Sequence, residues 1–376
     1  MTAARATAPP LVPATDIHRS AGGRGVTGVH RAPGARAVTD ALQAPGSRTG
    51  TDARQAVTDA AHAAVPISLG EVNERSALLA RFDRSYLVPV RTFLRLAEQL
   101  TDSRRRGGGG FRALTIDGRR AFRYHSTYYD TPGLRSFHDH RQGRRLRFKI
   151  RERVYEDTGE RQFEIKLKGG RGDTVKHRRL LAGAGFPPDV LLDVPPDAPP
   201  DISPDVLLGT PPDADCRAFL ARTLCHAYGI DAPEGLAPSL GTDYLRVTLV
   251  ADGERVTCDA GLVCSDLRTG RAVRCDPALV LVEVKTAGHL GAADRLLHAC
   301  GVRPAVFTKY CGGFAALRPS LPANRWRRAA ARAFGAPSPP GAALSADRGS
   351  APDPGAALPG YPRAGGDWPR PRGGAA

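Results

Sequence analysis

Four segments of this chain alternate between apolar and polar residues, and the polar side of each carries charge. The segments are 145–153, 161–168, 244–249 and 279–285. A period of two places successive side chains on opposite faces of a β-strand. In the first segment one face carries five cationic side chains, and the other carries Leu146, Phe148 and Ile150. The four segments therefore predict strands that have one apolar face and one charged face.

The charged faces restrict how these strands can be assembled. Five like charges on one exposed strand repel one another unless an anion or neighbouring acids neutralise them. Glu164 shares its predicted face with Lys166 and Lys168, and Glu283 shares its face with Lys285. The economical solution is a closed antiparallel barrel with a polar interior and an apolar outside covered by helices, which is an α+β fold. An open sheet with a basic groove is the alternative.

Three segments are predicted to supply the covering helices. Residues 89–100 begin with a proline and carry four apolar residues at helical spacing. Residues 213–229 run from an aspartate that can cap a helix to a glycine that can end one. Residues 290–300 form the third segment and are followed by Gly301.

Composition divides the chain into three parts. Residues 1–74 and 319–376 are rich in Ala, Gly, Pro and Arg, and both are expected to be disordered because they bury too little apolar surface to offset chain entropy. Residues 75–318 have the size of a single domain with its own core. The seven cysteines contain no Cys-x-x-Cys pair and predict reduced thiols. With no apolar leader or spanning segment, a cytoplasmic location without a transmembrane helix is expected.

The net charge of +16 favours a polyanionic partner, such as nucleic acid, an acidic membrane surface or polyphosphate. Nucleic acid is not expected, because interleaved aromatic residues and a recognisable helix-turn-helix are absent from the sequence. A membrane-protein partner remains open. Of the 54 basic residues only six are lysines, and all lie between Lys149 and Lys309. Lysine supplies a compact, mobile ammonium where arginine supplies a planar fork.

This placement of cations predicts a phosphate-binding interior. Arginine binds phosphate oxygens with two parallel hydrogen bonds, and lysine acts as a point charge. The candidate side chains on the charged faces are Arg145, Arg147, Lys149, Arg151, Lys166, Lys168, Lys176 and Arg178. Glu164 and Glu283 have two interpretations, as ion-pair partners or as ligands of Mg²⁺ or Mn²⁺ that bridges phosphate oxygens. Metal ligation is favoured for Glu283, and the two interpretations are about even for Glu164.

Eight short motifs occur in an order that resembles the VTC domain, the vacuolar-transporter-chaperone type of polyphosphate polymerase. This family is part of the triphosphate tunnel metalloenzymes, or CYTH-like superfamily, whose members share an eight-stranded tunnel. The resemblance covers about residues 75–317. The motifs are Arg81–Pro89, Ser126–Pro132, Arg145–Lys149, Glu164–Lys166, Val175–Arg178, Tyr244–Arg246, Glu283–Lys285 and Thr308–Tyr310.

The resemblance implies an activity and a set of site residues. ATP and inorganic polyphosphate would be the substrates, and the γ-phosphoryl group of ATP would pass to the growing chain with release of ADP. Glu283, Lys166 and Arg147 would act in catalysis, Glu283 would hold the metal, and Tyr244 would contact the nucleotide. The implied phosphate contacts are Arg145, Arg147, Lys166, Lys176, Arg246 and Lys309, with Lys285 beside the metal.

One motif departs from the family pattern. The first strand of family members carries Glu and Lys where this chain has Asp83 and Ser85. Losing a cation that contacts a phosphate costs about 2–4 kcal/mol of transition-state stabilisation. Arg81 or Arg84 could replace it, although Arg84 would point to the opposite face of a regular strand. A tunnel triphosphatase and a binding protein without catalysis are therefore the alternatives to the polymerase.

Overall fold

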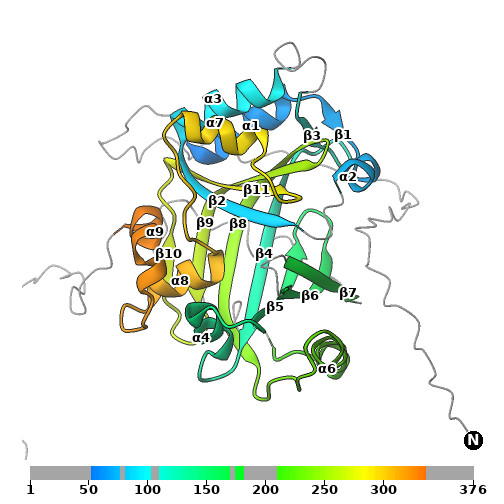
Figure 1. The fold of residues 1–376 in the computed structure, drawn as a ribbon, viewed down its shortest axis with the longest axis vertical. Helices are drawn as coiled ribbons and strands as arrows, with labels where there is room; N and C mark the ends of the chain where they lie inside the picture. The colour runs from blue at the N-terminus through cyan, green and yellow to red at the C-terminus, as the bar shows by residue number, and fades with distance from the viewer. Residues whose placement is uncertain (1–51, 77–80, 103–109, 170–173, 182–209, 336–376) are drawn as a thin grey trace, which may run out of the picture. The chain divides into compact units, whose positions relative to one another are not determined.

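A single sheet of eleven strands organises the part of the chain that the computed structural model describes, namely residues 52–76, 81–102, 110–169, 174–181 and 210–335. Figure 1 shows this sheet with helices around it. The strands are β1 (Pro66–Ile67), β2 (Phe82–Pro89), β3 (Arg112–Leu114), β4 (Ala121–Asp130), β5 (Phe148–Tyr155), β6 (Glu160–Lys168), β7 (Thr174–Leu181), β8 (Ala237–Ala251), β9 (Glu254–Asp266), β10 (Ala272–Arg274) and β11 (Leu279–Thr286).

Eight of these strands form a continuous antiparallel path in the order β2-β11-β9-β8-β4-β5-β6-β7. β10 pairs antiparallel with the last part of β9, and β3 pairs with β8. β1 is parallel to β3. The predicted strands 161–168 and 279–285 match β6 and β11 closely, and 244–249 lies inside the longer β8. The sequence was therefore sufficient to predict an antiparallel sheet with helices.

The two ends of the path, β2 and β7, meet without forming a ladder. An isolated bridge joins Arg81 to Thr174, at the first residue of β7. Beside it, the Nζ atom of Lys166 donates a hydrogen bond to Oδ2 of Asp83 at 2.8 Å, from β6 to β2. Because β7 pairs with β6 along its length and reaches β2 at this one point, the predicted closure of the barrel is not confirmed.

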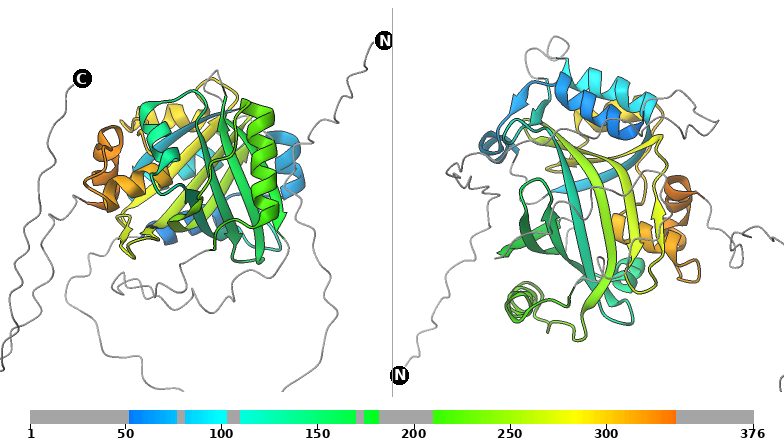
Figure 2. Two further views of the ribbon diagram at one scale, coloured as in Figure 1. Left: turned by 90° about the horizontal axis from the view of Figure 1, so that it is seen from below. Right: turned by 180° about the vertical axis from the view of Figure 1, so that it is seen from behind.

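Helices cover the apolar side of the sheet in three groups. α1, α3 and α7 lie together over one end, and α6 lies beside the strands at the other end (Figures 1 and 2). α4, α8 and α9 form the third group. The helices are α1 (Ala53–Ala63), α2 (Leu69–Ser76), α3 (Val90–Thr101), α4 (Arg135–Gln142), α6 (Ala214–Tyr228), α7 (Ala292–Ala299), α8 (Lys309–Leu317) and α9 (Asn324–Phe334).

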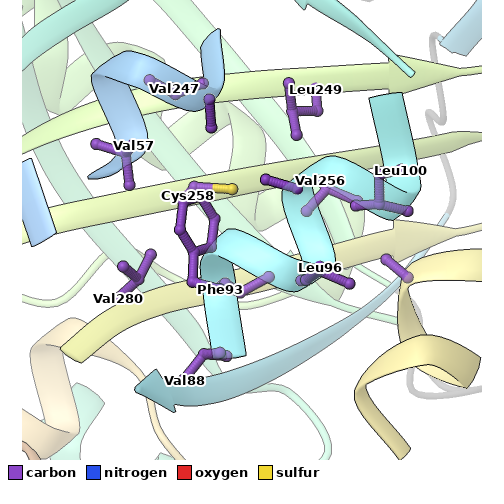
Figure 3. Packing of buried hydrophobic residues seen from close by; sticks show 14 of the residues in the cluster. Val57, Val88, Phe93, Leu96, Leu100, Val247, Leu249, Val256, Cys258 and Val280 are labelled. Atoms are coloured by element: carbon purple, nitrogen blue, oxygen red, sulfur yellow. The ribbon is translucent and has the colours of Figure 1, made fainter. Parts of the chain in front are cut away.

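The first group shows how alternation fixes the two faces of the sheet. Figure 3 shows Phe93, Leu96 and Leu100 of α3 packed over Val256 of β9 and Val280 of β11. All five side chains are buried. Since burying a side chain of this size stabilises the fold by about 1.5–3 kcal/mol, the apolar face is held against the helices. The charged residues that alternate with these positions must then point to the other side of the sheet.

α6 covers β5 and β6 in the same way. Phe148 and Ile150 of β5 and Phe163 of β6 are buried in one cluster with Leu220 and Leu224 of α6. The ends of this helix follow the sequence prediction. The side chain of Asp213 accepts a hydrogen bond from the amide of Cys216 at 2.6 Å, and Gly229 has a left-handed φ of 66° at the C-terminal cap.

The predicted strand 145–153 begins later than expected, at Phe148. α4 ends at Gln142, and Gly143 follows it with a φ of 67°. Leu146 is 41% exposed, so the apolar face has no partner to pack against before Phe148. Without that burial, the alternation of residues 145–147 does not produce a strand, and this part of the prediction is wrong.

The boundaries of the expected disordered tails are also wrong where the structure describes them. α1 lies inside residues 1–74, and its Ala56 and Val57 pack against β8 and β9. α9 lies inside residues 319–376, and its Trp326 is buried against Phe137 of α4. Small alanine side chains allow α1 to lie close to the sheet, which composition alone did not reveal. The remainder of both tails lies outside the described residues.

The described helices are too short or too polar to cross a bilayer. The longest of them, α6, has 15 residues, whereas a transmembrane helix needs about 20 apolar residues.

Candidate functional site: a cationic cavity on the inner face of the sheet

The inner face of the sheet surrounds a cavity of about 220 Å³. All eight strands of the main path contribute side chains to it, as alternation requires. Among the described residues, eleven cations line the cavity against three carboxylates, Asp157, Glu164 and Glu283. Asp83 and Asp259 pair with four of these cations from outside the lining, and positive charge still remains in excess. The cations are Arg81, Lys149, Arg151, Arg153, Lys166, Lys176, Arg178, Arg246, Arg255, Lys285 and Lys309.

Glu164 of β6 lies among four of these cations and is 1% exposed. Arg151 donates a hydrogen bond from Nε to Oε2 of Glu164 at 2.5 Å, and Lys176 forms an ion pair with Oε1. Arg153 and Arg178 lie 3.9 and 3.8 Å from the same oxygen. Burial opposes ionisation, but these cations outweigh it and hold the pKa of Glu164 well below its usual value. Glu164 therefore stays ionised and links β5, β6 and β7.

A second cluster surrounds Asp259 of β9. Arg246 donates from Nε to Oδ1 at 2.6 Å and from Nη2 to Oδ2 at 2.7 Å, which is a bidentate pair. Lys309, at the start of α8, also forms an ion pair with Oδ2. Despite its burial, Asp259 has its pKa lowered to about 2 by Arg246 and then Lys309. The carboxylate fixes both cations at the wall of the cavity.

Aromatic rings support the cations of this second cluster. Tyr124 and Tyr244 stack with their centroids 5.5 Å apart. The Nζ atom of Lys309 lies 4.3 Å from the centroid of Tyr244, and the guanidinium of Arg246 lies 5.1 Å from it. The Tyr244 hydroxyl accepts a hydrogen bond from Arg153 at 3.3 Å. Tyr244 is therefore engaged by the protein's own cations, which orient around it.

The third cluster lies where β2 meets β6 and β11. Asp83 accepts a hydrogen bond from Nε of Arg81 at 3.0 Å as well as from Lys166. Glu283 accepts one from Lys285 at 2.6 Å, and Lys285 also donates to Thr257 at 2.9 Å. Burial favours the neutral acid, but Lys285 and then Lys166 hold the pKa of Glu283 well below its usual value. The Glu283 side chain is 25% exposed, so this carboxylate remains open to the cavity.

Several cations of the cavity are buried enough that their protonated, charged form is disfavoured. Burial lowers the pKa of Lys149 and of Lys285 from 10.5 to about 8, with neighbouring cations adding to it. Burial and then Arg81 lower the pKa of Arg255 to about 10. Its Nε atom is buried without a hydrogen-bond partner among the described residues. The cavity therefore has unused hydrogen-bond donors and uncompensated charge, which suit a phosphate chain.

The sequence of residues 80–318 matches the family model of the VTC domain, which spans more than half of the chain. The chain belongs to the VTC domain family. The resemblance carried by the eight motifs is thereby confirmed. No curated protein matches the chain.

The solved structures that match this VTC domain have low identity and low TM-scores. A candidate adenylate cyclase of Vibrio parahaemolyticus is 11% identical, with a TM-score of 0.30 over 59% of this chain and 87% of that chain. A candidate adenylyl cyclase from Hippeastrum, described as having a dominant triphosphatase activity, is 14% identical, with a TM-score of 0.31 over 65% and 98% of the two chains. A protein from Pyrococcus horikoshii OT3 is 8% identical, with a TM-score of 0.28 over 59% and 88%.

The VTC domain brings most of the predicted site residues together. Ten of them line the cavity, although they come from five strands and α8. They are Lys149, Glu164, Lys166, Lys176, Arg178, Tyr244, Arg246, Glu283, Lys285 and Lys309. Their common feature is a position on the charged side of an alternating segment or at the start of a helix that abuts the sheet.

Three predicted phosphate contacts do not line the cavity. Arg145 is exposed in the turn before β5. The guanidinium of Arg147 donates to the carbonyl of Arg144 at 2.7 Å. Lys168 ends β6, where its backbone is tied to the hydroxyl of Tyr228. Because the strand begins at Phe148, Arg151 and Arg153 occupy the wall that Arg145 and Arg147 were expected to form.

The site prediction missed other residues that line the cavity, and it missed Asp259 behind the cavity wall. Arg151 is a cation of the predicted wall but has no role in the predicted site, and Arg153 has none either. Arg255 and Asp259 lie on one face of β9, in the alternating segment from Arg255 to Asp259. The alternation of this segment is the sequence signal for both residues. Arg81 precedes β2; it was expected only as a possible replacement for the missing lysine and was not assigned to the site.

The carboxylates differ in their fit to the divalent metal that tunnel enzymes generally use. Glu283 is open to the cavity. Asp83 is close enough to Glu283 for the two carboxylates to repel each other. One or two such carboxylates, completed by substrate phosphates, suit Mg²⁺ or Mn²⁺. Glu164 is enclosed by four cations, so the geometry supports its ion-pair interpretation. Within the described residues, no group of three acidic, histidine or cysteine side chains forms a preformed metal site.

Proposed function

We propose that this VTC domain is a polyphosphate polymerase that transfers the γ-phosphoryl group of ATP to a growing inorganic polyphosphate chain and releases ADP. The observation that carries the proposal is the cavity itself, where eleven cations from all sides face three carboxylates. A linear chain of phosphates has the charge density to neutralise such a wall. Membership of the VTC domain family supports the same substrate class.

In the proposed reaction, the cations hold donor and acceptor phosphates in line and stabilise the charge of the transferring group. Arg246 and Lys309, fixed by Asp259, supply a rigid bidentate fork and a point charge side by side. Lys166 reaches the cavity from β6, where it donates a hydrogen bond to Asp83. When substrate binds, Lys166 leaves Asp83 and contacts phosphate oxygens. The reaction needs no covalent intermediate, so a nucleophilic side chain is not required.

Glu283 is the proposed ligand of Mn²⁺ or Mg²⁺. When bound, such an ion would neutralise negative charge on the phosphate oxygens. Lys285 holds the Glu283 carboxylate from one side at 2.6 Å, and Thr257 holds Lys285 in turn. The carboxylate is therefore kept ionised and oriented before any substrate arrives.

Two of the proposed roles change with the geometry. Arg147, expected to act in catalysis, lies outside the cavity lining, and we assign its role to Arg151 and Arg153. Tyr244 was expected to contact the nucleotide, but its ring already contacts Tyr124, Lys309 and Arg246. Tyr244 therefore orients the phosphate-binding cations.

A triphosphatase is the second candidate, and Ser85 is the observation that favours it. Ser85 lies opposite Glu283 in the β2–β11 ladder and lines the cavity, where family members carry a lysine. Arg84 does not replace that lysine, because its guanidinium donates to Asp294 on the outer side at 3.0 Å. The missing cation leaves room for water beside the metal carboxylate, and water is the acceptor in a hydrolase.

Product analysis separates the candidates. The purified chain is incubated with ATP and Mn²⁺, and the products are resolved by gel electrophoresis and phosphate assay. A polymerase yields chains that lengthen with time and one ADP for each phosphate added. Release of orthophosphate without polymer would instead establish the triphosphatase. Binding of tripolyphosphate with neither product would leave a binding protein and refute both enzymes.

A further inference from the structure

The cavity is joined to a second basic surface through the C-terminal end of α4. α4 packs against β5, the strand of Lys149. His140 of α4 is half-buried, and desolvation followed by Lys149 and Arg147 lowers its pKa to about 2. Lys149 lines the cavity and donates to Thr308 at 3.1 Å. On the outside, the carbonyl of His140 accepts a hydrogen bond from Arg325 of α9 at 3.0 Å. α4 therefore connects the wall of the cavity to α9.

α9 presents a row of arginines on the face that does not pack. Trp326, Ala330 and Ala333 are buried toward α4 and α8. Arg325, Arg328 and Arg332 are spaced i, i+3 and i+7, so they share one face of the helix, and all three are exposed. Residues 319–335 contain no acid. The row therefore begins at the end of α4 and continues away from it with no compensating charge on its own helix.

Most of these arginines lack a partner. Arg328, Arg332 and Arg145 form no hydrogen bond or ion pair with any described residue, and Arg145 follows α4 in the chain. The nearby acid on α4, Asp139, is already paired with Arg144 at 3.4 Å and Arg135 at 3.8 Å. We call Arg145, Arg325, Arg328 and Arg332 the outer basic track. Four exposed arginines held on adjoining elements repel one another unless a polyanion lies along them.

We propose that the outer basic track binds the part of a long polyphosphate chain that extends beyond the cavity, which rests on the proposed substrate class. The track adjoins the cavity wall, because α4 contacts Arg325 through the carbonyl of His140 and packs against β5, the strand of Lys149. An acidic membrane fits less well, because the exposed face of α9 offers no large apolar side chain and Trp326 is buried. α9, which carries three of the four track arginines, lies beyond residues 80–318, so most of the track is outside the matched VTC domain.

The test compares two triple variants of the full chain. Arg145→Gln, Arg328→Gln and Arg332→Gln remove three track charges whose side chains have no described partner. The matched control is Arg91→Gln, Arg95→Gln and Arg222→Gln, on α3 and α6, where the side chains are also exposed and unpaired among the described residues. Both variants reduce the net charge equally. Binding of tripolyphosphate and of long-chain polyphosphate is measured for each by calorimetry over a range of salt concentrations.

The track variant is expected to bind long-chain polyphosphate about tenfold more weakly, with a reduced salt dependence. Its affinity for tripolyphosphate and both affinities of the control variant are expected to stay unchanged. The proposal would be overturned if both triple variants lost affinity for long-chain polyphosphate equally, or if the track variant lost none. Loss of binding to phosphatidylserine vesicles with polyphosphate binding retained would assign the surface to a membrane and overturn it as well.

The same measurements distinguish the track from the proposed function. Native protein that binds long-chain polyphosphate through the track but does not bind tripolyphosphate would refute the cavity and keep the track. If the native protein binds tripolyphosphate and the track variant binds long-chain polyphosphate as tightly as the native protein does, the cavity is kept and the track is refuted.

Discussion

Asp83 of β2 accepts a hydrogen bond from Lys166 of β6 at 2.8 Å, across the gap between the two ends of the sheet. The pair has two consequences. The ion pair holds the two ends of the strand path together where β2 and β7 form only an isolated bridge. It also engages Lys166, a cation that faces the cavity. A polyanion that enters the cavity must compete with Asp83 for this lysine.

Asp83→Asn is expected to separate these consequences. Without the carboxylate, Lys166 is free to bind phosphate, so tripolyphosphate binding measured in EDTA should tighten by roughly three- to tenfold. The free energy of unfolding without anion should fall by about 1–3 kcal/mol, because Lys166 and Arg81 lose a charged partner. The control is Asp215→Asn, which breaks an exposed pair with Arg179 and should change neither quantity measurably. Weaker binding in Asp83→Asn would contradict the competition.

Glu164→Gln is expected to destabilise the domain strongly. The substitution leaves four cations around a neutral amide, and removing one member of a buried ion-pair network costs about 3–5 kcal/mol. Saturating tripolyphosphate should recover part of this loss, because the ligand supplies the missing negative charge. Urea unfolding with and without the ligand measures both effects. Glu98→Gln on the exposed side of α3 is the control. A variant as stable as the native protein would refute the structural role of Glu164.

Glu283→Gln tests the proposed metal ligand. Turnover of ATP in the presence of Mn²⁺ is expected to fall by about 10²–10³, whereas metal-free binding of tripolyphosphate should be retained. Glu152→Gln is the matched control, since Glu152 pairs with Arg161 on the outer side of β5. Equal loss of turnover and of anion binding in Glu283→Gln would show that the residue supports the cavity as a whole and does not act on a metal.

Ser85→Lys restores the cation that family members carry at this position. The new ammonium would lie opposite Glu283, in a cavity with room for it. If the missing lysine limits the rate, kcat/KM with ATP should rise by about ten- to hundredfold. Ser85→Met adds similar volume without charge and should not raise it. A rate that Ser85→Lys leaves unchanged would mean that Arg81 or Arg255 already supplies the contact.

The pH dependence of anion binding is expected to reflect Lys149 and Lys285, whose pKa values are about 8. Both are charged below pH 8 and lose their protons above it. Tripolyphosphate affinity should therefore fall between pH 7 and pH 9, by up to about tenfold for each lysine that must be charged. Lys149→Arg keeps its charge and should remove its share of the decrease. An identical pH profile for native protein and variant would exclude Lys149.

The folded state responds to pH in the opposite direction. Because the pKa of each lysine is lower in the folded than in the unfolded protein, the unfolded chain binds more protons between about pH 8 and 10.5. These two lysines alone therefore make the substrate-free domain more stable as pH rises through this window. Ligand affinity and ligand-free stability should change in opposite directions.

Alternation along the strands was enough to predict most of the inner wall of the cavity. Lys166, Arg246 and Glu283 each lie on the charged face of a strand whose opposite face packs against helices. The start of β5 was not predictable in the same way. Residues 145–147 alternate as regularly as those that follow, but only Phe148 and Ile150 meet α6. Whether an alternating segment becomes a strand depends on a partner surface that lies elsewhere in the chain.

By itself, the sequence determined which side chains share a face, that the inner face is cationic, and that the chain belongs to the VTC domain family. Those properties follow from local periodicity and from the order of short motifs. Tertiary structure decided which charges meet: Glu164 with four cations, Asp83 with Lys166, and α9 with the end of α4. These partners lie up to about 185 positions apart, and their contacts depend on how strands and helices pack in three dimensions.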